Sequence, residues 1–168
     1  MDVVESLGTA KFEVPDVKIP DIIRRLDAND ESLVLLDIRS AEETDVSTIP
    51  GSISKAEFDA DPSKYADKEV VCFCTVGYIS AAKTCEYRRQ GLNNVKNMGD
   101  GAILGYTLAR TGAGVSQPLV KQNGTPTNEV HTFMPDLAPL AGTGMVGVSF
   151  ADPGIHIHVL FVCLFVYL

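Results

Sequence analysis

The chain has 168 residues, of which 45% are hydrophobic and 21% are charged. This length is typical of one domain, and the composition excludes a chain that is disordered throughout. The formal net charge of −8 argues against a nucleic-acid-binding protein that works by neutralising phosphates. The cysteines lack CxxC spacing, which argues against a zinc site and against a secreted disulfide framework; they are Cys72, Cys74, Cys85 and Cys163.

The two ends of the chain show no targeting or membrane-spanning pattern. The N-terminus has early acids and no apolar stretch behind a basic start, so we expect no signal or transit peptide and a cytoplasmic location by default. Residues 159–168 are all apolar, but a membrane-spanning helix needs about 20 such residues. We predict a strand or a tail outside the fold there, with a membrane-associating tail as the alternative, and no metal binding by His156 and His158.

The first half of the chain predicts a helix, a strand, a turn and a second strand. Apolar residues with helical spacing follow a proline, which predicts a short helix over residues 21–26. Continuous apolar runs at residues 33–36 and 70–73 are typical of strands buried on both faces of a parallel sheet. Between them, residues 49–53 (IPGSI) predict a turn that leads into a short extended piece.

The second half continues the alternation of helices and strands. Residues 80–90 predict a helix with Ser80 as its N-cap and Gly91 at its C-terminal end. Small side chains are expected on its packed face: Ala81, Ala82 and Cys85. Residues 94–98 predict a strand and residues 102–110 another helix. This alternation over short connections indicates an α/β fold, with a small parallel sheet flanked by helices on both faces.

Glycine and proline become frequent from residue 111 to residue 154, at a level where regular structure becomes doubtful. We therefore predict an irregular extension that lies along the domain. The predicted division of the chain is an N-terminal arm (1–16), the α/β domain (17–112), the irregular extension (113–154) and an apolar tail (155–168).

Cys74 stands where the second buried strand ends and a short loop leads into a helix. In open α/β sheets, ligands bind at the carboxyl ends of the strands. The N–H groups of such a loop can surround an anion, and the dipole of the helix favours negative charge. The same field lowers the pKa of a thiol and favours a nucleophilic thiolate. Cys74 is therefore a candidate nucleophile, with a structural buried thiol as the alternative, whereas Cys72 and Cys85 are interpreted as packing residues.

Four short motifs follow one another along the chain. Residues 35–43 (LLDIRSAEE) and 49–53 (IPGSI) are similar to a D-x-R…E…I-P-G-A-I pattern, and residues 74–80 (CTVGYIS) to a loop with the pattern C-x-x-G-x-R-S. Residues 94–106 are similar to an N-V-x-N-L…G-x-I-L-A-W ending. In this order the motifs resemble the rhodanese-like superfamily, in particular its single-domain members. Residues 118–132 look like an extension found in some eukaryotic members, so the resemblance covers roughly residues 17–131.

The resemblance implies a sulfurtransferase that works by double displacement, with no cofactor or metal. The Cys74 thiolate would attack the outer sulfur of a small anionic donor such as thiosulfate, and the resulting persulfide would pass its sulfur to a thiol or cyanide. The loop amides implied to bind the donor belong to Thr75, Val76, Gly77, Tyr78, Ile79 and Ser80. The motif residues implied to have a structural role are Asp37, Arg39, Glu43, Pro50 and Gly51.

The sequence departs from the family pattern at three places. Thr44 replaces a usual aromatic residue and residues 47–48 (ST) replace Gly-His, which we interpret as packing changes. Ile79 stands where active sulfurtransferases usually carry an arginine, whose charged planar fork suits an anionic substrate. This keeps a second hypothesis open, namely a rhodanese-like binding or regulatory module with weak or no catalysis. Phosphatases that share the fold need a C-x5-R loop, which is absent because Ser80 stands six residues after Cys74.

Overall fold

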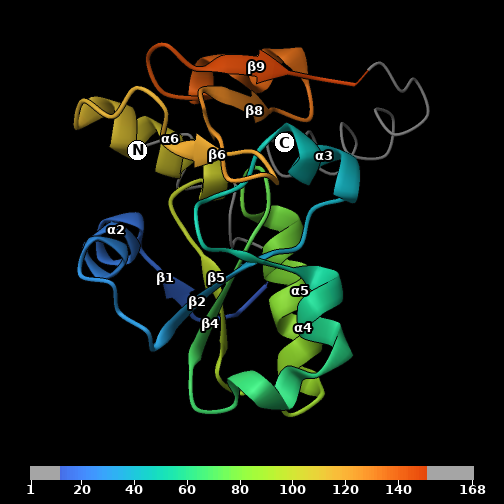
Figure 1. The fold of residues 1–168 in the computed structure, drawn as a ribbon. Coiled ribbons are helices and arrows are strands. Elements are labelled where there is room, and N and C mark those ends of the chain that lie inside the picture. Colours follow the sequence, from blue (N-terminus) through green and yellow to red (C-terminus); the bar gives the residue numbers. More distant parts are fainter. Residues whose placement is uncertain (1–11, 151–168) are drawn as a thin grey trace.

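The computed structural model describes residues 12–150, and its centre is a five-stranded parallel sheet with the strand order β1-β5-β4-β2-β3 (Figure 1). Every neighbouring pair in this sheet runs parallel. Its strands are β1 (Asp16–Val17), β2 (Leu33–Asp37), β3 (Ile53–Ser54), β4 (Glu69–Phe73) and β5 (Val95–Met98). The three longer strands and the turn before β3 lie where the sequence predicts them, and the predicted α/β fold is confirmed.

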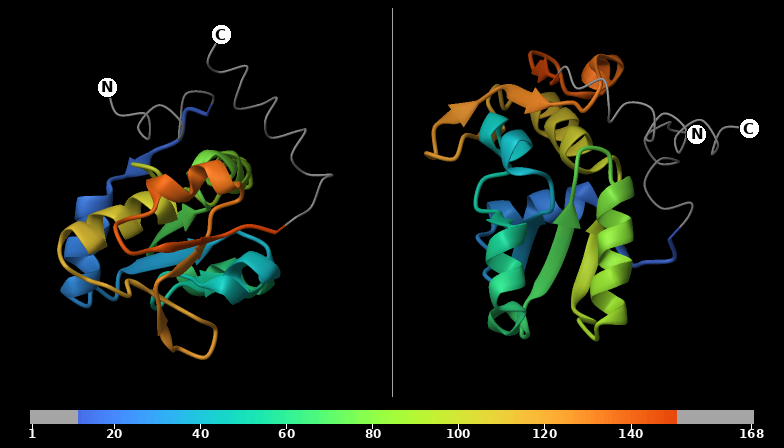
Figure 2. Two further views of the ribbon diagram at one scale, coloured as in Figure 1. Left: turned by 90° about the horizontal axis from the view of Figure 1, so that it is seen from above. Right: turned by 90° about the vertical axis from the view of Figure 1, so that its right-hand side faces the viewer.

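Helices cover both faces of the sheet (Figure 2). They are α2 (Ile19–Asp27), α3 (Ala41–Val46), α4 (Lys55–Ala60), α5 (Tyr78–Arg89) and α6 (Ala102–Gly112), with a 3-10 turn η1 (Pro62–Tyr65). In β4, Val71 and Phe73 pack into the apolar cluster under α2 and α6, whereas Val70 and Cys72 pack into the cluster under α4 and α5. Because both faces are covered, the strand is a continuous apolar run without alternation.

The first turn of α5 corrects the prediction that Ser80 is the N-cap. Gly77 is the N-cap, with a positive φ of 97° that a side chain would disfavour, and Ser80 is already the third helical residue. The N–H of Ser80 donates to the sulfur of Cys74, so this sulfur accepts the bond that a capping hydroxyl usually accepts at a helix start. The packed face also differs from the prediction, because Ala82 and Cys85 are only partly buried. The buried residues of α5 are Ser80, Ala81, Thr84 and Tyr87.

Several other features of the α/β body (residues 16–112) differ from the prediction: β1, α3 and α4 were not predicted, and α2 begins at Ile19, two residues earlier than predicted. The six-residue helix α3 is held by a capping box, in which Ser40 and Glu43 exchange side-chain-to-backbone hydrogen bonds. The last helix, α6, runs two residues further than predicted, to Gly112. The C-terminal end of α5 agrees with the prediction, because Gly91 has a positive φ of 94° and Leu92 donates back to the Tyr87 carbonyl.

The extension (residues 113–150) is largely irregular, as predicted, but contains short strands that the sequence pattern does not indicate. They are β6 (Leu119–Val120) paired antiparallel with β7 (Pro126–Thr127), and β8 (Glu129–His131) paired parallel with β9 (Val146–Val148), with a 3-10 helix η2 (Pro135–Leu140) between β8 and β9. These elements lie over α3 at the carboxyl-end edge of the sheet (Figures 1 and 2).

Some sequence predictions lie outside residues 12–150. They concern the N-terminal pattern, the apolar run 159–168, and the side chains of His156, His158 and Cys163. The division of the chain at residues 16, 112 and 154 stays a prediction. No helix within residues 12–150 combines the length and apolar character that crossing a membrane requires.

Candidate active site

Cys74 follows the last residue of β4 and lies at the bottom of the loop that leads into α5. Its side chain is buried, with only 3% of the residue exposed. The sulfur accepts the backbone N–H of Gly77 at 3.2 Å and that of Ser80 at 3.4 Å. The Ser80 hydroxyl lies 3.4 Å from the same sulfur and 3.1 Å from the Gly77 carbonyl, so its single proton serves one of the two. The loop therefore curls around the sulfur and directs N–H groups toward it.

The rest of the loop backbone has unused donors. The amide N–H groups of Thr75, Val76, Tyr78 and Ile79 find no acceptor within residues 12–150. Together with those of Gly77 and Ser80, they are the six amides that the sequence analysis assigns to the loop. Unpaired donors at the start of a helix favour a negatively charged partner.

A second helix begins beside the first. The N–H groups of Ile103 and Leu104, in the first turn of α6, donate to the carbonyls of Cys74 and Thr75 at 3.2 and 3.3 Å. The start of α6 is thereby bonded to the backbone of Cys74 and Thr75, while the start of α5 directs N–H groups at the Cys74 sulfur. Helix N-termini of this kind favour negative charge close to them.

The other two described cysteines have different surroundings. Cys72 lies on β4, fully buried, and burial raises the pKa of its thiol to about 12. A thiol of this kind stays protonated and inert at neutral pH. Cys85 lies on α5, partly buried and outside the loop. Of the three, Cys74 is the thiol whose sulfur accepts backbone N–H groups of the loop.

Ile79 projects from the first turn of α5 with half of the residue exposed. The aromatic ring of its neighbour Tyr78 contacts Phe12 edge to face, with centroids 5.6 Å apart. At the position where the family pattern has an arginine, the loop therefore presents an apolar side chain to solvent. This side chain offers neither a charge nor a hydrogen-bond donor to an anion.

Asp37 and Arg39 form a buried pair beside the loop. Asp37 is the last residue of β2 and lies opposite Phe73, the last residue of β4. It is therefore at the same carboxyl end of the strands as Cys74. The Arg39 guanidinium donates twice to its carboxylate, at 2.9 and 2.7 Å, and both side chains are 1% exposed. Thr48, at a position where the family has histidine, donates its hydroxyl to Asp37 at 2.7 Å. The pair fixes the segment between β2 and α3, which agrees with a structural role.

The remaining motif residues lie away from the sulfur. Pro50 and Gly51 form the exposed turn before β3, where Gly51 has a positive φ of 77°. Ser47, which replaces the family's glycine, donates its hydroxyl to the Glu129 carbonyl of the extension at 2.7 Å. Thr44 donates its hydroxyl to the Ser40 carbonyl, one turn earlier. Thr44, Ser47 and Thr48 thus all have polar partners, and Ser47 and Thr48 connect the end of α3 with the extension and with Asp37.

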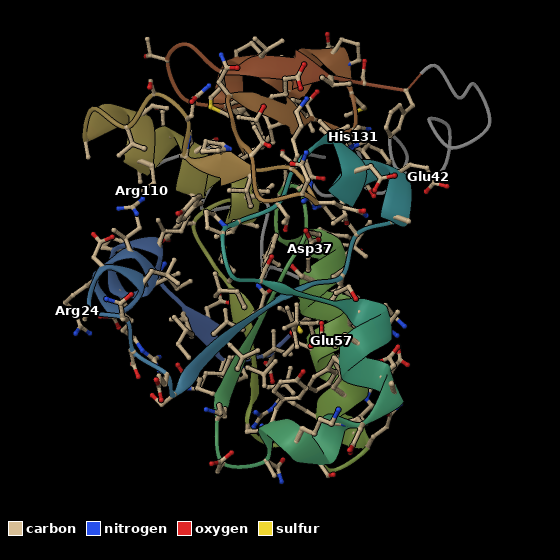
Figure 3. All side chains as sticks on the ribbon, viewed as in Figure 1. Arg24, Asp37, Glu42, Glu57, Arg110 and His131 are labelled. Atoms are coloured by element: carbon tan, nitrogen blue, oxygen red, sulfur yellow. The ribbon has the colours of Figure 1, made fainter. Side chains whose placement is uncertain are left out.

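The structure also brings a histidine to the site that the sequence analysis did not consider. His131 of β8 lies beside α3 (Figure 3), and its Nδ1 is 2.9 Å from Oε1 of Glu43. The same oxygen receives the Thr75 hydroxyl at a long 3.4 Å. Burial raises the pKa of Glu43, but the hydrogen bonds of His131 and of the Ser40 amide outweigh it and hold that pKa below its ordinary value. The only sequence pattern that points to part of this contact is the S-x-x-E capping box at residues 40–43, which places Glu43 in the first turn of a helix.

A sequence model of the rhodanese-like domain matches residues 20–103, which is half of the chain and includes β2, the Cys74 loop and the start of α6. The chain belongs to the rhodanese-like domain family. The resemblance inferred from the four motifs is thereby confirmed. No curated protein sequence matches the chain.

Several solved structures are similar to this rhodanese-like chain. Thiosulfate sulfurtransferase from Pseudomonas aeruginosa is 24% identical with a TM-score of 0.51, and the match covers 81% of this chain and 25% of that one. A rhodanese-related protein from Thermoplasma volcanium is 22% identical, over 63% of this chain and 97% of that one, with a TM-score of 0.48. A single-domain sulfurtransferase from Saccharomyces cerevisiae is 21% identical, over 63% and 98%, with a TM-score of 0.44. The likeness to the Pseudomonas protein, at 24% identity, supports the fold alone.

Proposed function

We propose that this chain is a sulfurtransferase that carries a sulfane sulfur on Cys74. The observation that carries the proposal is the sulfur of Cys74 at the end of β4, which accepts N–H groups of the loop and of the first turn of α5. The start of a second helix, α6, is bonded to the carbonyl of the same residue. A thiolate in such a field is a competent nucleophile and needs no general base to activate it. Family membership and the thiosulfate sulfurtransferase among the similar structures support the same reading.

The proposed reaction has two displacements at sulfur. In the first, the Cys74 thiolate attacks the outer sulfur of thiosulfate, an S–S bond forms, and the bond to the sulfonate breaks, so that sulfite leaves with the electron pair. In the second, an acceptor thiolate attacks the outer sulfur of the Cys74 persulfide and becomes a persulfide itself, while the Cys74 thiolate leaves. The charge on the sulfur is conserved through both steps, so the unpaired loop amides face an anion throughout the cycle.

One observation favours a second candidate function, a rhodanese-like binding module with little catalysis. The half-exposed Ile79 offers no charge to an anionic donor. Under this alternative the loop amides bind an anion or an acidic group without chemistry. The two candidates differ in whether Cys74 acquires a sulfur atom.

The deciding experiment is incubation of the protein with thiosulfate, followed by intact mass measurement and fragment mapping. Sulfur transfer predicts a gain of one sulfur atom on Cys74, removed by a thiol reductant and absent from Cys74→Ser. Cys85→Ser is the matched control and should still be loaded, because Cys85 lies outside the loop. A wild-type protein that stays unmodified with thiosulfate and with organic persulfides would favour the binding module.

A further inference from the structure

A chain of three side chains connects the extension with the residue next to Cys74. His131 of β8 contacts Glu43 of α3 at 2.9 Å, and Glu43 receives the hydroxyl of Thr75 at 3.4 Å. Three elements that are far apart in sequence therefore meet at one carboxylate. Its other oxygen accepts the Ser40 amide at 3.1 Å, so the carboxylate cannot turn without breaking the capping box.

The direction of these hydrogen bonds follows from the chemistry of the carboxylate. Glu43 has a lowered pKa and is ionised at neutral pH, so both of its oxygens accept. The Nδ1 of His131 must then carry the proton, whether or not the imidazole is charged. The ring is held in place, since it stacks on Phe150 with centroids 4.6 Å apart and meets Phe133 edge to face. His131 therefore presents a rigid donor to Glu43.

Thr75 is well placed to transmit this contact to the sulfur. Its carbonyl is fixed by the Leu104 N–H and that of Cys74 by the Ile103 N–H. The two carbonyls of the Cys74–Thr75 segment are thus fixed by α6, and the Thr75 side chain is fixed by the Glu43 carboxylate. Small displacements of groups around a reacting atom reduce rates strongly.

We propose that His131 is a positioning residue of the Cys74 loop: its Nδ1–H orients Glu43, and Glu43 holds the hydroxyl of Thr75. This inference rests on the proposed function for its kinetic consequence, but not for the geometry itself. It assigns the extension a part in the active site, because β8 supplies the residue that completes the contact.

The pH dependence of this contact follows from the charged groups that face Glu43. Arg39 approaches from the segment before α3 and His131 from β8, while the loop contributes the uncharged Thr75 hydroxyl. The lowered pKa of Glu43 means that the contact is complete above the ordinary carboxyl range and is lost as the pH falls through the lowered value. Without His131, the largest contribution that lowers the pKa of Glu43 is lost, so that pKa rises and the loss of the contact begins at higher pH.

Two substitutions at one position separate donation from packing. His131→Phe keeps a ring that can stack on Phe150 but has no N–H. His131→Asn removes the ring but places a side-chain N–H close to where Nδ1 was. We expect the rate of Cys74 persulfide formation to fall roughly tenfold in His131→Phe, with its acid limb moved to higher pH, and to recover largely in His131→Asn. Lys121→Met, which removes an exposed ion pair from the same extension, is the control and should behave as wild type.

Two further measurements keep this test separate from the sulfurtransferase proposal. Carboxyl NMR titration reports the Glu43 pKa, and mapped alkylation by iodoacetamide reports the state of the Cys74 loop. Neither measurement needs sulfur transfer, so both remain decisive if wild type forms no persulfide. The Glu43 pKa should rise in His131→Phe and return toward wild type in His131→Asn, and the alkylation rate of Cys74 should change in the same variants.

Thr75→Val removes the hydroxyl that Glu43 accepts, and so tests the same contact from the loop. It replaces the His131 variants in the test if one of them does not fold. Because both residues act through Glu43, the effects of His131→Phe and Thr75→Val should not add in the double variant. Additive effects would overturn the proposal. So would wild-type behaviour of His131→Phe, or a loss in His131→Asn as large as that in His131→Phe, because the N–H would then have no role of its own.

Discussion

The body and the extension of this protein reach their structures by different means. In the body, strands buried on both faces meet helices in two apolar clusters, and Val70, Val71, Cys72 and Phe73 are fully buried in succession. The extension has strands of only two or three residues. It adds Leu119, Val130 and Ala141 to one of these clusters, and polar contacts such as that from Ser47 to the Glu129 carbonyl attach it to α3. The difference teaches that paired strands and helices build the body, whereas the extension is held to it by a few buried apolar side chains and single polar contacts.

The largest difference is expected for one chemical change made in both regions. Asp37→Asn leaves the buried Arg39 guanidinium without its charged partner, and breaking a buried pair costs about 3–5 kcal/mol of the free energy of unfolding. Glu129→Gln removes the exposed partner of Lys121 in the extension and should cost about 0–1 kcal/mol. Urea unfolding of both variants measures the two values. Equal losses would refute the contrast between the regions.

A substitution in the Cys74 loop of the body should change the activity and leave the free energy of unfolding nearly unchanged. Ile79→Arg adds a guanidinium at an exposed position beside the unpaired amides, and a charge-assisted hydrogen bond contributes about 1.5–3 kcal/mol. The kcat/KM for thiosulfate should therefore rise roughly tenfold to a hundredfold, less at high salt. Ile79→Gln is the uncharged control and should gain little. If Ile79→Arg gains nothing while wild type is loaded by thiosulfate, the backbone alone already saturates donor binding.

Close packing in the body predicts a smaller effect at a single glycine. A Cβ on Gly105, where the family pattern has alanine, would lie 1.9 Å from the Asp100 carbonyl oxygen and 2.7 Å from Ile19. Gly105→Ala should therefore cost about 1–3 kcal/mol by overpacking between α6 and α2. Gly112→Ala, on the same helix with open space around it, should be neutral or slightly stabilising. Thermal unfolding of the pair gives the comparison, and a neutral Gly105→Ala would contradict it.

The smallest effect is expected where the extension attaches. Ser47→Ala removes the hydroxyl that bonds the Glu129 carbonyl, a loss of about 1 kcal/mol. The loss should appear locally, as faster hydrogen exchange of the Thr48 and Val120 amides, which bond each other's carbonyls. Ser63→Ala, on the exposed η1 turn, should leave these amides unchanged. Faster exchange throughout the sheet would show that the extension stabilises the body as a whole.

The difference between body and extension also explains which elements could be predicted from the sequence. Continuous apolar runs and a Gly91 helix end are local signals, so β2, β4, β5 and the end of α5 were predictable. Helix α3 was not, since it has six residues and no apolar periodicity, and Ser80 was misplaced because a cap formed by the Cys74 sulfur has no sequence signature. The His131 contact with Glu43 spans 88 positions, and no local pattern encodes such a pairing.

The position of β1 at the far edge of the sheet has a consequence for biosynthesis. Its register partners Asp16 with Asn97, and their side chains share a hydrogen bond of 2.9 Å across 81 positions. A chain emerging from the ribosome therefore carries β1 without its partner until β5 has been made. The five-stranded sheet is complete only once β5 has been made, and the extension, which follows in sequence, can join α3 only afterwards. We therefore expect folding to depend on contacts between distant parts of the chain, with the extension that carries His131 joining last.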